Sequence, residues 1–133
     1  MPYLRLIQPS MQNLAETVAS ALDVEVAIAD KNLTRIVGTG QFYTRLDEDC
    51  ADDSLFAQVL EKGSPIVNLT RGDYCDKCSH VKECSEFANM SHPIRIGKEV
   101  CGVVSFASFD MEQTNIMRLK REEYFNMLKE LSM

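Results

Sequence analysis

Hydrophobic positions recur first at helical and then at strand spacing in the N-terminal part of the chain. From residue 9 to residue 22 the apolar side chains repeat every three or four positions, which predicts an amphipathic helix. Residues 24–30 alternate and are rich in β-branched side chains, and residues 34–37 resume an extended pattern. Because the Asp-Lys-Asn at 30–32 favours a turn, the two runs predict a β-hairpin.

The middle of the chain predicts a short helix, a strand and a second hairpin. Residues 53–63 have a capping Asp or Ser at the start, an apolar stripe and a final Gly, as a short helix does. Residues 65–69 predict a third strand. From His92 the strand pattern returns, and a Gly-Lys-Glu turn at 97–99 separates it from a strongly apolar strand predicted over 100–109.

Residues 111–133 contain neither Gly nor Pro and predict one long C-terminal helix. Met117, Tyr124 and Leu131 recur every seven residues, with Leu128 between the last two, so the helix carries a narrow apolar seam. The seam either packs against the chain's own sheet or projects toward a partner helix or a following domain. The final LKELSM has no cap or Gly stop, so we expect the chain to be cut from a longer one.

This order of elements predicts an α+β fold in which an antiparallel sheet is flanked by helices. A chain of 133 residues is expected to form a single compact domain. We divide it into a globular part over residues 1–110 and a signalling or dimerisation helix over residues 111–133.

Composition and charge exclude several functions. With 45% hydrophobic and 26% charged residues, the chain is expected to fold as an ordinary globular protein. Fourteen Lys and Arg against twenty Asp and Glu give a net charge of −6, which disfavours direct binding of nucleic acid or of anionic lipid. No apolar run approaches the roughly 18 residues needed to cross a bilayer, and MPYLRLIQPS lacks a signal-peptide core. We therefore expect a cytoplasmic protein.

Three of the five cysteines, Cys75, Cys78 and Cys84, are clustered. In a reducing compartment such thiols are expected to be free, redox-active or metal-bound. The two-residue gap lets the first two sulfurs face one ion, and Cys84 can return as a third ligand. His92, at the start of the next strand, would complete a Cys3His set that suits Zn(II) or an iron–sulfur cluster equally well. The alternative is three unrelated thiols on a loop.

The other candidate ligands are weaker. His80 is expected to be a solvated bystander, and Cys101 lies in an apolar strand where a small buried hydrophobe fits. Cys50 lies in an acidic connection without a nearby partner. The sequence also lacks GxxxxGK[ST], GxSxG, GxGxxG after a strand, and HExxH, so it offers no basis for the chemistries that these motifs serve.

Four stretches of the sequence carry a family resemblance: IQPSMQNLAETVASALDVEVAIADKNLTRIVGTG, SLFAQVLEKGSPIV, CDKCSHVKEC and PIRIGKEVCGVVSFASF. Together with the order of elements, they resemble the N-terminal sensory region of bacterial sigma-54-dependent transcriptional activators. The resemblance covers nearly the whole chain. It implies a GAF/PAS-like, non-catalytic sensor domain that precedes an AAA+ ATPase and a helix-turn-helix DNA-binding domain in the full-length protein.

The resemblance also concerns the cysteine segment. Related sensors are similar in having CxxCx5C followed by a further Cys just before the Pro-Ile of the next strand. This chain matches at Cys75, Cys78 and Cys84, whereas His92 takes the last place. The resemblance thus implies a sensor of a small-molecule or redox effector. From the cysteine spacing we expect it to hold a metal or cluster, and from the apolar seam we expect it to form a homodimer through the C-terminal helix.

Three alternatives remain open from the sequence. A small organic effector can bind beneath the sheet, with the cysteines bracing a loop around zinc. The chain can also be a thiol enzyme, either a CxxC oxidoreductase using Cys75 and Cys78 or a GAF-type methionine sulfoxide reductase. Finally, it can be a plain dimerisation module that works through the apolar seam.

Overall fold

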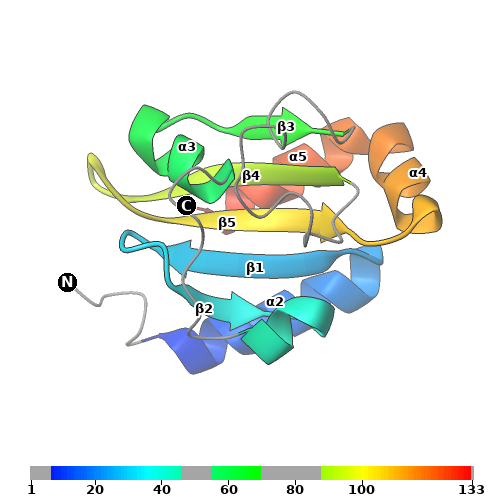
Figure 1. Cartoon of the computed structure of the whole chain (residues 1–133), viewed down its shortest axis with the longest axis horizontal. Coiled ribbons are helices and arrows are strands. Elements are labelled where there is room, and N and C mark those ends of the chain that lie inside the picture. The colour runs from blue at the N-terminus through cyan, green and yellow to red at the C-terminus, as the bar shows by residue number, and fades with distance from the viewer. Residues whose placement is uncertain (1–6, 46–54, 70–87, 133) are drawn as a thin grey trace.

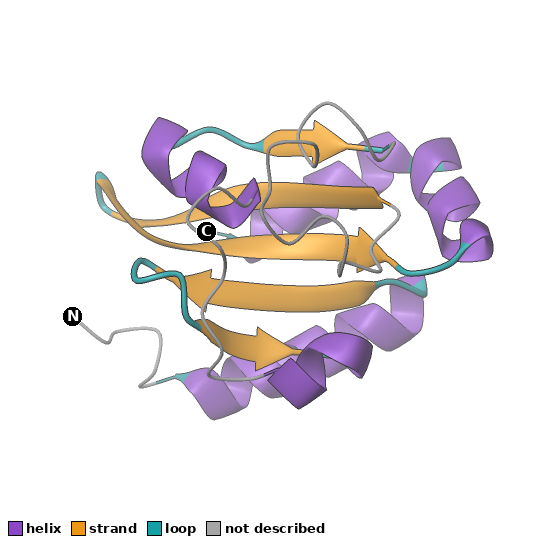
Figure 2. Cartoon of the chain, in the orientation of Figure 1, coloured by secondary structure: helices purple, strands orange, loops and turns teal. Residues whose placement is uncertain are grey.

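A computed structural model describes residues 7–45, 55–69 and 88–132 of the chain (Figure 1). The strands are β1 (Glu25–Asp30), β2 (Arg35–Gly38), β3 (Ile66–Asn68), β4 (Ala88–Ile96) and β5 (Glu99–Ser108). The helices are α2 (Gln8–Leu22), the 3₁₀ helix η1 (Gly40–Arg45), α3 (Leu55–Lys62), α4 (Met111–Leu119) and α5 (Arg121–Leu131). In the described part the strands form one antiparallel sheet in the order β2-β1-β5-β4-β3, with helices on both faces (Figure 2). The predicted α+β class is therefore confirmed.

The predicted first helix and first hairpin are both present. The Asp30 carboxylate accepts hydrogen bonds from the backbone N–H groups of Asn32 at 2.9 Å and Thr34 at 3.1 Å. These bonds hold the turn between the strands, as Asp commonly does. β1 consequently runs antiparallel to β2, with Ala27 opposite Gly38.

The second hairpin, formed by β4 and β5, is also present, but β4 is longer than predicted. It begins at Ala88 rather than at His92. Asn89 and Ser91 interrupt the apolar pattern of this stretch, although both side chains are buried. A buried polar side chain looks like a surface position in the sequence, which explains the late predicted start. The acidic connection that contains Cys50 lies largely outside the described residues.

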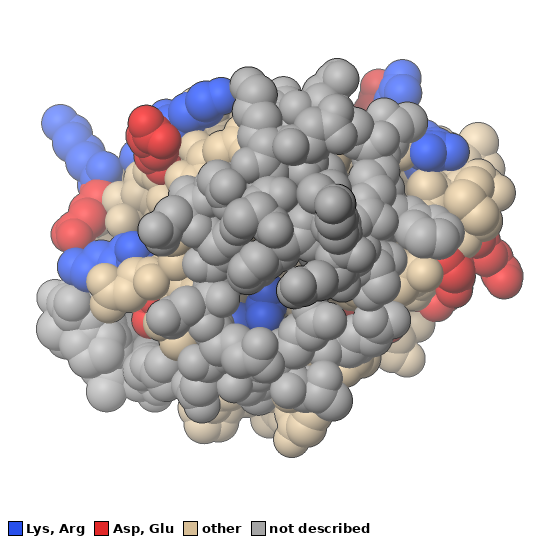
Figure 3. Space-filling view, in the orientation of Figure 1, with Lys and Arg blue, Asp and Glu red and all other residues tan. Residues whose placement is uncertain are grey.

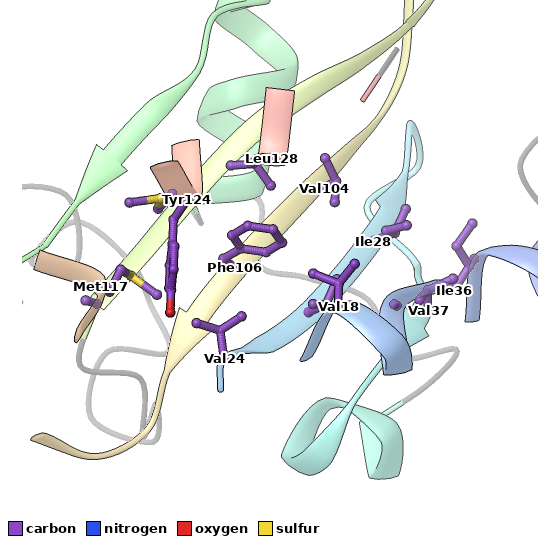
Figure 4. Close-up of a cluster of buried hydrophobic side chains, with 14 of the residues drawn as sticks. Val18, Val24, Ile28, Ile36, Val37, Val104, Phe106, Met117, Tyr124 and Leu128 are labelled. Atoms are coloured by element: carbon purple, nitrogen blue, oxygen red, sulfur yellow. The ribbon is translucent and has the colours of Figure 1, made fainter. Parts of the chain in front are cut away.

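One face of the sheet packs against α2, α4 and α5 through large apolar side chains (Figure 4). Its core includes Val26, Ile28, Met90, Val104 and Phe106 from the strands, Val24 just before β1, and Val18, Met117, Tyr124 and Leu128 from the helices. We call this face the helix face. The opposite face packs against α3 and η1, and we call it the α3 face.

The C-terminal segment is helical as predicted, but it forms two helices. Lys120, with φ −109° and ψ 28°, interrupts the helix between α4 and α5. Met117, Tyr124 and Leu128 of the predicted seam are buried in the core beneath the chain's own sheet. Packing on the own sheet therefore accounts for the seam, and these three side chains are not exposed to a partner helix.

Two glutamines of α2 hydrogen-bond to the backbone of β2. Gln12 Nε2 donates to the Gly38 carbonyl at 2.7 Å, and Gln12 Oε1 accepts from the Gly38 N–H at 3.1 Å. One turn earlier, Gln8 Nε2 donates to the Ile36 carbonyl at 3.1 Å. The spacing of i and i+4 side chains on a helix, about 6 Å, matches two residues of a strand, about 6.8 Å. The helix thereby occupies backbone groups through which an edge strand could otherwise pair with another chain.

The Gln12→Ala substitution is expected to lower the free energy of unfolding by about 1–2 kcal/mol, because both hydrogen bonds to Gly38 are lost. Asn13→Ala, one position along on the exposed side of α2, is the control and is expected to change it by less than about 0.5 kcal/mol. Urea denaturation measures both. Equal stabilities of the two variants would show that the glutamine contact contributes nothing.

Tyr124 joins α5 to the end of α2, since its hydroxyl donates to the Leu22 carbonyl at 2.6 Å. Burial raises the pKa of Tyr124, and the carboxylates of Asp23 and Glu123 raise it further. A raised pKa means that the folded chain keeps this proton longer than the unfolded chain does. Its contribution to stability is complete below about pH 10, the ordinary tyrosine value, and is lost as the pH rises through the raised pKa.

We expect Tyr124→Phe to be about 1 kcal/mol less stable than the unmodified chain at pH 7, because one hydrogen bond is lost. The difference should shrink above pH 10, where the unmodified chain loses its advantage. Tyr43→Phe, at an exposed tyrosine, serves as the control and should follow the unmodified chain at every pH. Denaturation curves at a series of pH values test this, and a constant difference between Tyr124→Phe and the unmodified chain would contradict it.

Candidate functional site

The α3 face of the sheet is built largely from small side chains. In the strand register, Ala27 of β1 lies opposite Ser105 of β5, and Ser105 lies opposite Ser91 of β4. Ala29 and Ala107 lie on the same face and are also fully buried. Since protein interiors are close-packed, the layer above such a floor must be filled by groups from outside the sheet.

Aromatic side chains supply part of that filling. Phe42 of η1 and Phe56 of α3 are buried there, with Phe109 packed against them. The rings of Phe42 and Phe109 meet at 5.2 Å and 68°, and the Arg35 guanidinium lies 5.2 Å from the centre of the Phe42 ring. Position 38 requires glycine, because a Cβ there would lie 2.7 Å from the backbone and the Cβ of Phe42.

A buried polar network crosses three strands of the same face. The Ser91 hydroxyl donates to Asn89 Oδ1 at 2.6 Å and is hydrogen-bonded to the Ser105 hydroxyl at 3.2 Å. Asn68 of β3 lies opposite Asn89 in the register and is buried as well. We call Asn68, Asn89, Ser91 and Ser105 the polar network. Its hydroxyl and carboxamide groups can both donate and accept hydrogen bonds without carrying charge.

Small-molecule sites typically have a mostly apolar lining with a few placed polar groups. The α3 face has this composition, because it combines small and aromatic apolar side chains with the polar network. Polar groups in an apolar layer are costly unless they are hydrogen-bonded, so their placement limits what can lie against them. On the side of the molecule seen in Figure 3, basic and acidic side chains of the described residues are interspersed near the margin. The α3 face is therefore our candidate site for a small ligand with hydrogen-bonding groups.

The predicted metal ligands fall into two groups. Cys75, Cys78 and Cys84 lie outside the described residues, as do Cys50 and His80. His92 is described: it is half-buried on β4, and its side chain is on the helix face, where its ring centre lies 5.9 Å from that of Phe125. Among the residues that the structure describes, no three His, Cys, Asp or Glu side chains are grouped so that they could hold a metal.

The contacts of His92 determine which ring nitrogen carries a proton. Nδ1 lies 2.9 Å from the Pro93 carbonyl oxygen and 2.9 Å from Ser132 Oγ. A carbonyl oxygen only accepts, so Nδ1 must be the donor. In the neutral ring Nε2 then keeps its lone pair, which is the form in which a histidine ligates a metal through Nε2.

Cys101 is a buried thiol on β5, as predicted. Its Sγ donates to the Ile94 carbonyl at 3.4 Å, and burial raises the pKa of the Cys101 thiol. A raised pKa keeps the sulfur protonated and unreactive at neutral pH.

Sequence reasoning missed the polar network. The signal that could have found it is the alternation of large and small residues in β5, where Val104 and Phe106 alternate with Ser105 and Ala107. This pattern indicates a strand that is buried on both faces. Large side chains fill the core on one face, and small side chains on the other leave room for groups from outside the sheet.

The comparisons with known proteins agree with this fold. No protein-family model matches the chain. The chain is 32% identical over 132 residues to UacR of Escherichia coli, whose name describes a uric acid sigma-54-dependent transcriptional regulator; the match covers 97% of this chain and 22% of UacR. The GAF domain of a phosphoenolpyruvate-protein phosphotransferase from Coxiella burnetii superposes with a TM-score of 0.64 at 10% identity, covering 88% of this chain and 85% of that one.

A type II free methionine-R-sulfoxide reductase from Thermoplasma acidophilum superposes with a TM-score of 0.62 at 13% identity, covering 85% of this chain and 84% of that chain. These similarities show that the chain has the fold of GAF domains and confirm the predicted fold. The match to UacR is more specific, since nearly the whole chain is similar to one part of a sigma-54-dependent transcriptional regulator. In its described part, no helix is both long and apolar enough to span a bilayer.

Proposed function

We propose that this chain is the signal-input domain of a cytoplasmic transcriptional regulator and that it does not itself catalyse a reaction. The observation that carries the proposal is the match to UacR, which extends over 97% of the chain. The chain spans about a fifth of the length of that relative, 22%. An AAA+ ATPase and a DNA-binding domain in the full-length protein are accordingly part of the proposal.

The similarity to a methionine sulfoxide reductase supports the shared fold only, because the identity is 13%. The match to a regulator favours sensing over thiol catalysis. A homodimer is also proposed, but on other residues than the seam. Met111, Leu119 and Met127 are the exposed large apolar side chains that the described α4 and α5 offer for such a contact, at 53%, 82% and 40% exposure.

We infer that the effector binds on the α3 face, against the polar network. Three features support this site: the small side chains of the floor, the aromatic side chains of Phe42 and Phe56 above it, and the uncharged donors and acceptors of Asn89 and Ser91. An effector that suits them is a small, flat molecule with alternating donor and acceptor groups. The name of the relative supports a purine such as uric acid as the first probe.

Uric acid is expected to bind the chain in isothermal titration calorimetry, and Ser91→Ala is expected to weaken the binding about five- to tenfold, because one hydrogen bond to the ligand or to Asn89 is lost. Ser20→Ala, at an exposed position of α2, is the control and should bind as the unmodified chain does. Equal binding by Ser91→Ala would place the site elsewhere, and no binding by the unmodified chain would reject uric acid as the effector.

The cysteine segment is proposed as a second input, with Cys75, Cys78, Cys84 and Nε2 of His92 as ligands of Zn(II) or of an iron–sulfur cluster. The spacing of the cysteines supports the soft donor set. The lone pair on Nε2 supports His92, since metal-bound histidines usually donate their other N–H to a carbonyl or a similar acceptor.

Anaerobically purified chain is expected to contain about one metal site per chain, which the Cys75→Ser, Cys78→Ser double variant should lose entirely. His92→Ala should retain the metal more weakly, by about 10- to 100-fold in affinity, because three ligands remain. Cys101→Ala is the control and should keep full occupancy. Elemental analysis measures the content, and a visible spectrum separates a coloured cluster from colourless zinc. An unchanged metal content in the double variant would refute the site.

A further inference from the structure

We propose that His92 is a latch that fastens the last turn of α5 to the sensory sheet and reports the state of β4 to that turn. The latch consists of His92, Ser132 and the Lys129 carbonyl. This proposal rests on the proposed function, because it names the route by which the α3 face would control the end of the last helix.

The first step of the argument is the direction of the hydrogen bonds. Ser132 Oγ lies 2.7 Å from the Lys129 carbonyl, which can only accept, so the single hydroxyl proton of Ser132 is committed there. Toward His92, 2.9 Å away, Ser132 Oγ must therefore accept. The one proton on His92 Nδ1 is shared between two acceptors at 2.9 Å, the Pro93 carbonyl and Ser132 Oγ, and the Ser132 hydroxyl proton goes to the Lys129 carbonyl.

The second step is the position of Ser132 at the end of α5. Its backbone N–H is hydrogen-bonded to the Leu128 and Lys129 carbonyls, and only 4% of its surface is exposed. The last carbonyls of a helix lack partners within the helix, and the Ser132 hydroxyl, held by His92 of the sheet, satisfies that of Lys129. His92 contacts Phe125 in α5 and Ser132 just after it, seven residues apart, so it aligns the helix against the sheet.

The third step is the geometry of β4. Successive side chains of a strand point to opposite faces of the sheet. Ser91 lies in the polar network on the α3 face, and His92, the next residue, lies in the latch on the helix face. A shift of the β4 backbone that follows a change at Ser91 must therefore displace the His92 ring relative to Ser132. Because the bond from His92 Nδ1 to Ser132 Oγ depends on this distance, a shift of β4 changes the strength of the latch, as a transmitted signal requires.

The test is hydrogen exchange of the backbone amides at residues 128–132, measured on the chain without any effector. Ser132→Ala and His92→Phe, which keeps an aromatic ring beside Phe125, are each expected to speed exchange in this turn about fivefold, the effect of one lost hydrogen bond. Ser20→Ala is the control and should leave the turn unchanged. Unchanged exchange in both Ser132→Ala and His92→Phe would overturn the latch.

Transmission is tested by combining variants. Ser91→Ala, on the other face of the sheet, is expected to change exchange at residues 128–132 by at least about twofold, and this change should disappear in the Ser91→Ala, Ser132→Ala double variant. A purely structural role for Ser132 would leave the effect of Ser91→Ala intact, and that result would overturn the proposal. If the latch results hold while uric acid fails to bind, the effector has been misassigned and the latch stands.

Discussion

The fold depends on the pairing of β5 with β1 on one side and β4 on the other. β5 has large apolar side chains, Val104 and Phe106, toward the helix face, and small ones, Ser105 and Ala107, toward the α3 face. Because the side-chain period of a strand is two, a slip of one residue in this register would exchange the two faces and bury neither correctly. The large side chains hold α2, α4 and α5 in place, whereas the small ones leave the opposite layer to other groups. Both the core and the candidate site follow from this alternation.

The two faces can therefore serve different purposes without separate domains. The helix face is a dense apolar core, completed by hydrogen bonds from Tyr124 to the end of α2 and from Gln12 to β2. The α3 face has smaller side chains, mainly alanines and serines, and a buried polar network. A ligand bound on the α3 face would contact strands whose opposite face packs against α2, α4 and α5. In a sensor this arrangement joins input and output through the thickness of one sheet, and β4, with Ser91 and His92 adjacent, is its shortest path.

Most elements could be predicted because their signals are local. The apolar stripe of α2, the turn at Asp30 and the Gly after α3 each act within a few residues, and each is where it was expected. The start of β4 was missed because buried Asn89 and Ser91 look like surface residues. The break at Lys120 was missed because no Gly or Pro marks it, and the seam of Met117 and Tyr124 is compatible with one continuous helix. For the cysteine site, the sequence supplies spacing, and of its proposed ligands the structure describes His92 alone.

The sequence by itself determined the class of the fold and the family resemblance, since both depend on the order of elements and on stretches of matching residues. Only the tertiary structure decided which distant side chains meet. Ser132 reaches His92 across 40 positions, and Tyr124 reaches Leu22 across 102. Such contacts depend on strand register and on the angle at which a helix crosses the sheet. Local patterns of polarity do not encode either quantity, because registers that differ by two residues would bury the same side chains.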